Sequence, residues 1–452
     1  MSVALLSMEH ERPYGVDEVF YSTTDRRGVI ETVNSTFVRL SRFSEDALVG
    51  APHNLIRHPD MPGGAFRIMW DRLLAGRSMA AYVVNLAADG VPYRTFSTVT
   101  PLGDGFLSVR SAVTRPDLWE PVVDAYRLTR ALENGVRRAG ASRAEAATIG
   151  AQDLLRRLRG LGFDDYDDVI RTLLPAEVDG RRAAGGGSAR PLTRPGDRWH
   201  DVVVGLITID HELGELRARY EDAAEVAADL GRVAGTLHVS LDALARAADA
   251  AAEASEAVAA SAPVLPPTAR ATVTLARALR ETVRPLSVAL DAQRRRLLDL
   301  RAALALSVLH TDMALLVAAD LIAGTAIGDP ARSIGDLTTA VASSIEEGEE
   351  TRRAAAAGLL AAADAVDDAH ARLLEFQRLL ANWRTLVVRS GVGERLSAGL
   401  APIDARLGEG MRDMAALTAL AARCRGLAAP LDTGDLRGAA ASVVGAVRAG
   451  RE

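Results

Sequence analysis

The sequence predicts a chain of two parts, an α+β domain followed by a long, entirely α-helical region. Segments with strand-like alternation, many glycines and prolines, and six of the eight phenylalanines all lie before about residue 115. After Trp119 no strand pattern is left, and apolar residues recur at helical spacing. Hydrophobic residues make up 48% of the 452 residues but aromatic residues only 4%, which is typical of long alanine- and leucine-rich helices.

The α+β domain should contain one antiparallel sheet. Asp-Gly steps at Asp89-Gly90 and Asp104-Gly105 suit tight turns, so three successive strands are expected to form a meander. Short helices should cover the concave face of the sheet and leave a pocket there. The expected strands cover residues 28–33, 79–87, 93–101 and 105–113, and the expected helices 35–40, 44–48 and 64–75.

Helices continue after this domain and are interrupted by a segment rich in glycine and proline. Helical patterns cover residues 119–138, 142–161 and 166–174. The string AAGGGSARPLTRPG then predicts a flexible linker. The chain is therefore expected to divide into residues 1–118, a helical connector over 119–179, a linker over 180–198 and a helical output region over 199–452.

The output region opens with a heptad repeat. Its apolar positions are Leu206, Ile209, Leu213, Leu216, Tyr220, Ala223, Ala227, Leu230, Ala234, Leu237, Leu241 and Leu244. Such a narrow seam predicts pairing with another helix. Proline and glycine near residues 263–267 and 328–330 mark helix ends, and further helices are expected over 268–327, 333–387, 391–426 and 435–448. This region should be an antiparallel helical bundle or a dimeric coiled coil.

Charge and composition exclude several classes of function. The net charge of −6 argues against nucleic-acid binding, and the absence of lysine excludes lysine-based covalent catalysis. A single cysteine, Cys424, is compatible with a reducing compartment. The start of the chain does not read as a secretory signal, and the most apolar stretch, residues 302–323, is interrupted by His310, Asp312 and Asp320. We expect a cytoplasmic protein without membrane insertion.

Enzymatic and metal-binding motifs are not found in the sequence. The helical segment around His211 is similar to the phospho-accepting segment of sensor kinases, but no asparagine box or glycine-rich ATP lid follows it. No paired histidines occur at metal-ligand spacing, and no glycine-rich phosphate loop with lysine is present. The sequence therefore predicts a protein that is not an enzyme and holds no metal ion.

The most specific motif is GAPHNLIRHPDMP at residues 50–62. Val33-Asn34 with Phe37 precedes it, and a predicted helix containing Trp70 follows it directly. This string in this frame resembles the signature of the flavin-binding PAS domains of bacterial aerotaxis receptors. The resemblance covers about a quarter of the chain and implies a PAS sensor domain over residues 1–118.

The residue types of this motif suit a flavin. A cation near the ring favours its electron-rich reduced form, so Arg57 and His58 are candidates, and Asp60 is placed to orient the imidazole of His58. A flat ring also needs apolar partners, for which the candidates are Phe37, Phe66, Trp70 and Tyr82. The resemblance implies an FAD site that contains Asn34, Arg57, His58 and Asp60. Trp70 is added to the predicted cofactor site as a flat apolar partner.

Two alternatives stay open for this site. Haem is a second possible ligand, with His53 or His58 as the axial group. The motif is otherwise a structural turn in which Arg57 pairs with Asp60, and the protein is then a cofactor-free PAS domain with a helical scaffold that docks a partner. A visible absorption spectrum distinguishes these interpretations.

A second resemblance concerns the region between residues 306 and 347. A helix ending in DLIAGTAIGDP is followed by SIGDLTTAVASSIEE, which is similar to the signalling hairpin of methyl-accepting chemotaxis proteins. The resemblance implies a chemotaxis-type signalling partner at the glycine-containing tip. The leading interpretation is a homodimeric transducer that senses redox state or oxygen through a flavin and passes the signal to the helical region.

Overall fold

The computed structural model describes residues 11–187, 190–396, 417–429 and 433–451. They belong to two compact units. The first comprises Met1–Arg217, Arg301–Gly348 and Asp432–Glu452, and the second comprises Ala218–Leu300 and Glu349–Leu431. Three of the four boundaries between these units fall inside long helices, after Arg217, Leu300 and Gly348.

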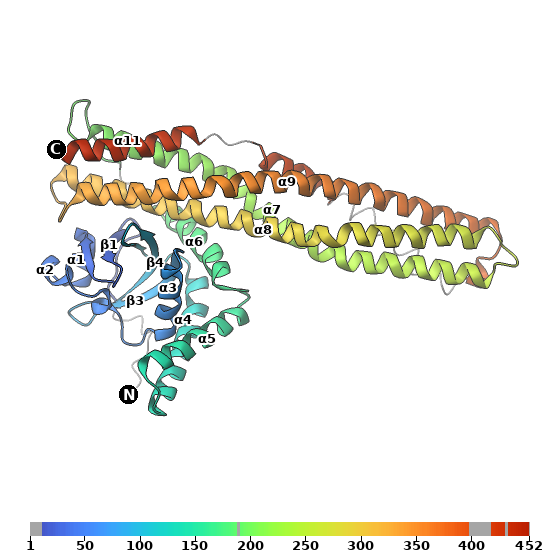
Figure 1. Ribbon diagram of the computed structural model, residues 1–452, viewed down its shortest axis with the longest axis horizontal. Coiled ribbons are helices and arrows are strands. Elements are labelled where there is room, and N and C mark those ends of the chain that lie inside the picture. Colours follow the sequence, from blue (N-terminus) through green and yellow to red (C-terminus); the bar gives the residue numbers. More distant parts are fainter. Residues whose placement is uncertain (1–10, 188–189, 397–416, 430–432, 452) are drawn as a thin grey trace. The chain divides into compact units, whose positions relative to one another are not determined.

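The first unit contains a five-stranded antiparallel sheet with the strand order β2-β1-β5-β4-β3. The sheet lies in the blue part of the ribbon in Figure 1. Its strands are β1 (Phe20–Asp25), β2 (Ile30–Val33), β3 (Met79–Leu86), β4 (Pro92–Leu102) and β5 (Gly105–Ser111). Strands β3, β4 and β5 form the expected meander. The sequence did not single out β1, because five of its six residues are buried and it lacks the alternation of a half-buried strand.

Short helices accompany the sheet, as expected for the α+β class. They are α1 (Ser35–Ser41), α2 (Glu45–Leu48), the 3-10 turn η2 (His53–Ile56) and α3 (Gly63–Leu74). Asn34 and Ser44 cap α1 and α2, because their side chains accept backbone N–H bonds from Phe37 and Ala47. Helices α1, α2 and the η2 turn contribute to a buried core of Phe20, Ile30, Val33, Phe37, Leu40, Leu48, Ile56, Ala87 and Tyr93.

The connector forms three helices, α4 (Pro116–Arg138), α5 (Arg143–Gly160) and α6 (Tyr166–Ala183). Helix α3 packs closely on α5, because a Cβ atom on Gly64 would lie 2.3 Å from the backbone of Gly150 and Ala151. Helix α6 runs further than the sequence predicted and enters the range expected to be linker. Buried hydrogen bonds of Glu177 and Arg181, each 1% exposed, hold this extra length. Described residues between α6 and His200 form no helix or strand.

Four helices complete the first unit. They are the beginning of α7 (His200–Ala257), the end of α8 (Leu265–Ala323), the beginning of α9 (Pro330–Arg389) and α11 (Gly434–Arg451). Helices α7 and α11 touch where a Cβ atom on Gly205 would lie 2.4 Å from the Val443 side chain. The heptad positions of this part, from Leu206 to Leu216, are buried within the same chain. Pairing with a second chain stays a prediction.

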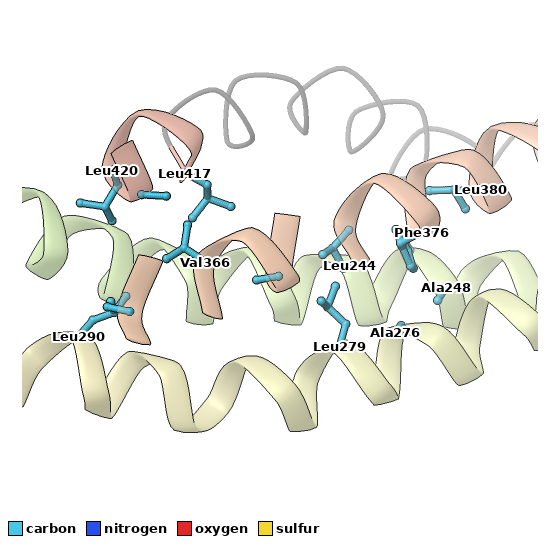
Figure 2. Close-up of a cluster of buried hydrophobic side chains, with 14 of the residues drawn as sticks. Leu244, Ala248, Ala276, Leu279, Leu290, Val366, Phe376, Leu380, Leu417 and Leu420 are labelled. Carbon is cyan, nitrogen blue, oxygen red and sulfur yellow. The ribbon is translucent and has the colours of Figure 1, made fainter. Parts of the chain in front are cut away.

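The second unit is an antiparallel bundle built from α7, α8, α9 and a helical segment over 417–427. Figure 2 shows part of its core, including Leu244, Ala248, Ala276, Leu279, Leu290, Val366, Phe376, Leu380, Leu417 and Leu420. The heptad positions Ala223, Ala227, Leu230 and Leu244 are buried in it. The side chains of Tyr220, Ala234, Leu237 and Leu241, and residues 397–416 of the helix expected over 391–426, lie outside the described residues.

One segment of the described chain is long and apolar enough to cross a bilayer, Val288–Ala323. His310, Asp312 and Asp320, which interrupt the apolar stretch expected over residues 302–323, do not prevent this segment from reaching that length and composition. Within the structure, 72% of that window is buried against other residues. Burial of this kind is also found in the core helices of soluble proteins.

Candidate functional site

A cavity of about 350 Å³ lies between the sheet, the η2 turn and helix α3. Small-molecule sites usually have volumes of about 300–1,000 Å³. Its apolar lining consists of Ile56, Phe66, Met69, Trp70, Leu73, Val83, Val99 and Phe106. Its polar side chains are Thr24, Arg27, His53, Asn54, Arg57, Asn85, Ser97, Ser108 and Arg110. The cavity confirms the pocket expected on the concave face of the sheet.

The lining carries positive charge. Three guanidinium groups, Arg27, Arg57 and Arg110, contribute to it, while no aspartate or glutamate is among its lining residues. A wall with cations and hydrogen-bond donors favours ligands that present anionic or electron-rich acceptor atoms.

Arg57 and Trp70, two of the predicted site residues, line this cavity. Trp70 packs edge-on against Phe106 with the ring centroids 5.6 Å apart. A Cβ atom on Gly28, which has a φ of +80°, would lie 3.1 Å from the Trp70 ring. The glycine therefore lets the tryptophan approach the backbone closely at the cavity wall.

Arg57 also holds the motif to its surroundings. Its Nη2 donates to the Met61 carbonyl at 2.7 Å, and its guanidinium lies 3.9 Å above the centre of the Phe66 ring. Burial and the nearby Arg130 lower the pKa of Arg57. These contacts replace the Arg57–Asp60 pair of the structural-turn alternative.

His58 and Asp60 lie beside the cavity but are not among its lining residues. The backbone N–H of Asp60 donates to His58 Nδ1 at 3.2 Å, while the Asp60 carboxylate is 4.0 Å from the same nitrogen. Burial lowers the pKa of His58, and Asp60 opposes that shift. The hydrogen bond to the His58 imidazole thus comes from the backbone of Asp60 and not from its carboxylate, the group that the sequence suggested for this role.

Asn34 is also outside the cavity lining. Its Oδ1 accepts the backbone N–H groups of Tyr21 and Phe37, both at 3.3 Å, and its Nδ2 donates to the Val19 carbonyl at 3.3 Å. The side chain thus joins β1 to the start of α1. In this structure Asn34 supports the fold and does not contact a ligand site.

Two of the aromatic candidates lie elsewhere. Phe37 belongs to the buried core, with its ring centroid 5.5 Å from that of Phe20. Tyr82 points to the opposite face of the sheet, because Val83 and Asn85 on the same strand line the cavity and side chains alternate along a strand. The prediction that Phe37 and Tyr82 contact the ligand is therefore not supported.

Sequence reasoning overlooked Asn85 as a site residue. The side chain is 2% exposed, and its Nδ2 has no hydrogen-bond partner within the described residues. Leaving a buried amide donor unpaired is unfavourable, so an acceptor on a ligand is the natural partner. Side chains two residues apart on a strand lie on the same face, so Asn85 could have been identified once Val83 was assigned to the cavity.

Arg110 and His53 form a second polar group in the cavity. Arg110, 3% exposed, donates from Nη2 to His53 Nε2 at 2.5 Å. Burial and the adjacent guanidinium lower the pKa of His53 to about 3, so its imidazole is neutral near pH 7. Because this hydrogen bond uses the Nε2 lone pair, His53 is poorly placed as an axial haem ligand.

Contacts from helix α6 join the far face of the sheet to the helices of the first unit. Glu177 accepts a hydrogen bond from the Tyr82 hydroxyl at 2.7 Å and another from the Thr114 backbone at 2.7 Å. One helical turn later, Arg181 forms a buried ion pair with Asp312 of α8. Helix α6 is thus bonded to the sheet through Glu177 and to α8 through Arg181.

The turn between α8 and α9 also contacts the N-terminal domain. Ile327 packs against the core that contains Phe20 and Phe37. The Ser35 hydroxyl donates to Asp320 at 3.2 Å, and the Tyr21 hydroxyl bonds to Ser333. The segment that resembles a signalling tip therefore lies against the sensor domain in this structure.

The strand order, the short helices and the cavity define the N-terminal segment as a PAS domain. It is of the aerotaxis-receptor type, because the aerotaxis receptor of Escherichia coli strain K12 is 33% identical to the N-terminal region over 129 residues. Those residues are 27% of this chain and 26% of the receptor, so the chain matches about a quarter of that relative.

Solved structures with a similar domain include the LOV protein of Rhodobacter sphaeroides, at 19% identity and a TM-score of 0.22 over 34% of this chain and 92% of that one. Another is the blue-light activated histidine kinase EL346 of Erythrobacter litoralis, at 15% identity and a TM-score of 0.21 over 37% and 57% of the two chains. No protein-family model matches this chain. In the described residues, no cluster of histidine, cysteine or acidic side chains is arranged to hold a metal ion.

Proposed function

We propose that this protein is a signal transducer whose PAS cavity binds FAD and senses redox state or oxygen. The observation that carries the proposal is the buried Asn85 amide, which faces the cavity without a partner in the described structure. The apolar walls, the guanidinium groups and the cavity volume support the same ligand class.

The residues present fit a flavin. Trp70, Phe66 and Phe106 offer flat apolar surface for a ring system, and Asn85 and Arg57 offer donors for its carbonyl and nitrogen acceptors. A bound flavin supplies reversible electron transfer, and nearby positive charge favours its electron-rich state. Cys424, the chain's single cysteine, belongs to the other compact unit, so no thiol in this cavity is available for covalent attachment.

Strand β3 and helix α6 are the proposed route for the signal. Asn85 and Val83 of β3 face the cavity. Tyr82 of the same strand lies on the other face of the sheet, where its hydroxyl donates to Glu177 of α6. A small shift of β3 on a change in the ligand moves this hydrogen bond and alters how α6 holds Asp312 through Arg181. The helical region is then biased between alternative packings.

An absorption spectrum of purified protein, followed by reconstitution with FAD, tests the proposal directly. We expect flavin bands that bleach on chemical reduction. Asn85→Leu should weaken FAD binding about tenfold, which corresponds to the roughly 1–3 kcal/mol of one hydrogen bond to a buried group. Isothermal titration of cofactor-free protein measures this affinity.

Tyr82→Phe is the matched control, because Tyr82 lies on the same strand but faces away from the cavity. It should leave FAD affinity unchanged. A folded, colourless protein that cannot be reconstituted with FAD would overturn the flavin proposal and favour the cofactor-free scaffold. A haem spectrum would instead favour the second ligand considered from the sequence.

We further propose that the protein acts in the cytoplasm, without catalytic activity of its own, and passes its signal to a chemotaxis-type partner. The exposed side chain of His211 lies beside the buried seam of α7, where a solvated polar residue is ordinary. Homodimerisation is part of the proposal, and analytical ultracentrifugation of the full chain tests it.

A further inference from the structure

The PAS cavity contains a buried guanidinium that no carboxylate neutralises. Among the described residues, Arg72, Arg110 and Arg181 are buried. Arg72 pairs with Asp167 at 2.6 Å, and Arg181 pairs with Asp312. Arg110 lines the cavity, and in the described structure its charged neighbours do not include an acidic residue. The unpaired buried arginine is thus the one that faces a ligand site.

The partners of Arg110 are all neutral. Both terminal nitrogens lie 3.2 Å from the Ser22 hydroxyl, Nη1 lies 3.4 Å from the Ser108 carbonyl, and Nη2 donates to His53 at 2.5 Å. Burial lowers the pKa of Arg110 to about 10, which still leaves the group charged at neutral pH. Because the pKa of His53 is about 3, this pair carries one positive charge.

A buried ion without a counter-ion is unfavourable, and proteins normally pair such groups or neutralise them. Guanidinium cannot be neutralised near pH 7. The cavity wall supplies no carboxylate, and Asn85 adds a second donor that lacks an acceptor. The remaining source of negative charge is the molecule that fills the cavity.

We propose that the ligand supplies the counter-charge of Arg110, placing an anionic or electron-rich acceptor group against it, so that Arg110 selects the ligand by charge. This inference rests on the proposed function and deepens it. For a flavin, Arg110 then stabilises the electron-rich state of the ring more than Arg57 and His58, the residues that the sequence suggested.

Arg110→Met separates this role from a structural one. Methionine fills similar space without charge, so cofactor-free Arg110→Met should be at least as stable to urea as wild type, while its FAD affinity falls at least tenfold. Arg72→Met is the matched control, because Arg72 is buried but paired outside the cavity. It should lower the urea midpoint and leave FAD affinity unchanged.

Ser22→Asp tests the same idea from the opposite direction. The Ser22 hydroxyl lies 3.2 Å from both terminal nitrogens, so an aspartate there supplies the carboxylate that the wall lacks. It should raise the urea midpoint of the cofactor-free protein and weaken FAD binding at least tenfold. Asparagine has the shape of aspartate without its charge, so Ser22→Asn should neither raise the urea midpoint nor weaken FAD binding. This pair decides the question if Arg110→Met does not fold.

The outcomes separate this inference from the flavin proposal. Unchanged FAD affinity in Arg110→Met or in Ser22→Asp overturns the charge-compensation role. If wild type binds no FAD, the flavin proposal fails, and the urea midpoints of the cofactor-free proteins then decide alone. A midpoint for Arg110→Met at or above that of wild type, together with a higher midpoint for Ser22→Asp, supports the role. A lower midpoint for Arg110→Met, or a midpoint for Ser22→Asp that is not raised, overturns it.

Discussion

At the scale of single residues, the cavity separates groups that face a ligand from groups that only hold the fold. Asn34 illustrates the second kind, since both ends of its amide bond to the backbone, at Val19 and Tyr21 on one side and at Phe37 on the other. Loss of cofactor in a variant at such a position follows from lost folding and not from a lost ligand contact. The two causes need separate measurements.

Asn34→Ala should lower the free energy of unfolding by about 0.5–2 kcal/mol, the usual cost of losing a helix N-cap. Asn34→Ser keeps a capping oxygen and should recover much of that loss. Urea unfolding of the cofactor-free protein measures both. For folded protein we expect an unchanged FAD dissociation constant, and a tenfold weaker one in Asn34→Ser would contradict the structural role.

A buried histidine in α8 predicts pH-dependent stability. His310 is 1% exposed, neither ring nitrogen has a hydrogen-bond partner in the described structure, and burial lowers its pKa to about 4. The unfolded chain, with a histidine pKa near 6.5, therefore binds a proton first as pH falls. Stability is present above about pH 6.5 and is lost towards pH 4.

His310→Leu should remove about 2 kcal/mol of the stability difference between pH 7 and pH 5, as expected for this pKa shift. Urea midpoints at the two pH values measure it. The exposed His211 provides the control, and His211→Leu should keep the wild-type pH dependence. An equal loss of stability at both pH values in His310→Leu would indicate a packing defect instead.

At the scale of elements, helix α6 joins the PAS sheet to α8. Glu177 is 1% exposed and accepts bonds from Tyr82 and from the Thr114 backbone and hydroxyl. Desolvation and the nearby Glu177 carboxylate raise the pKa of Tyr82, so its hydroxyl keeps the proton that it donates. The element is therefore positioned by buried polar contacts and not by hydrophobic packing alone.

Tyr82→Phe should cost about 1.5–3 kcal/mol of unfolding free energy, the usual range for a hydrogen bond to a charged group. Tyr93→Phe is the control, because Tyr93 is fully buried and its hydroxyl has no partner within the described residues. That change should be neutral or slightly stabilising. Reduction of the cofactor should change the rate of amide hydrogen exchange in α6 of the wild type. The same reduction should change that rate only weakly in Tyr82→Phe.

At the scale of the first compact unit, the turn between α8 and α9 packs on the PAS domain. Ile327 lies on the PAS core, while Ile322 on the same segment is 39% exposed. An exposed glycine-containing tip would be free to bind a partner, whereas this turn is partly covered by the chain itself. The rate of amide hydrogen exchange in this turn therefore reports how well the turn packs on the PAS domain.

Ile327→Asp should speed amide exchange in residues 324–329 severalfold and lower the unfolding free energy by roughly 1–3 kcal/mol, because it places a charge on an apolar core. Ile322→Asp, at an exposed position, should change neither quantity. Exchange mass spectrometry of the full chain measures the first effect. Equal behaviour of the two variants would contradict the packing of the turn.

The α+β class of the first domain and the β3–β4–β5 meander were predictable from the amino-acid sequence alone. These features depend on local signals, namely turn residues, caps and alternation. Arg57 and Trp70 were predictable as cavity residues because Arg57 belongs to the motif and Trp70 to the helix that follows it directly.

Which side of β3 faces the cavity could be read only from the folded chain, in which Asn85 and not Tyr82 lines the cavity. Alternation defines two faces of a strand, but the helices that cover each face decide their roles. The unpaired charge of Arg110 and the covered turn at Ile327 likewise depend on residues distant in sequence. Contacts of this kind depend on how distant segments pack together, and a local sequence pattern does not predict that packing.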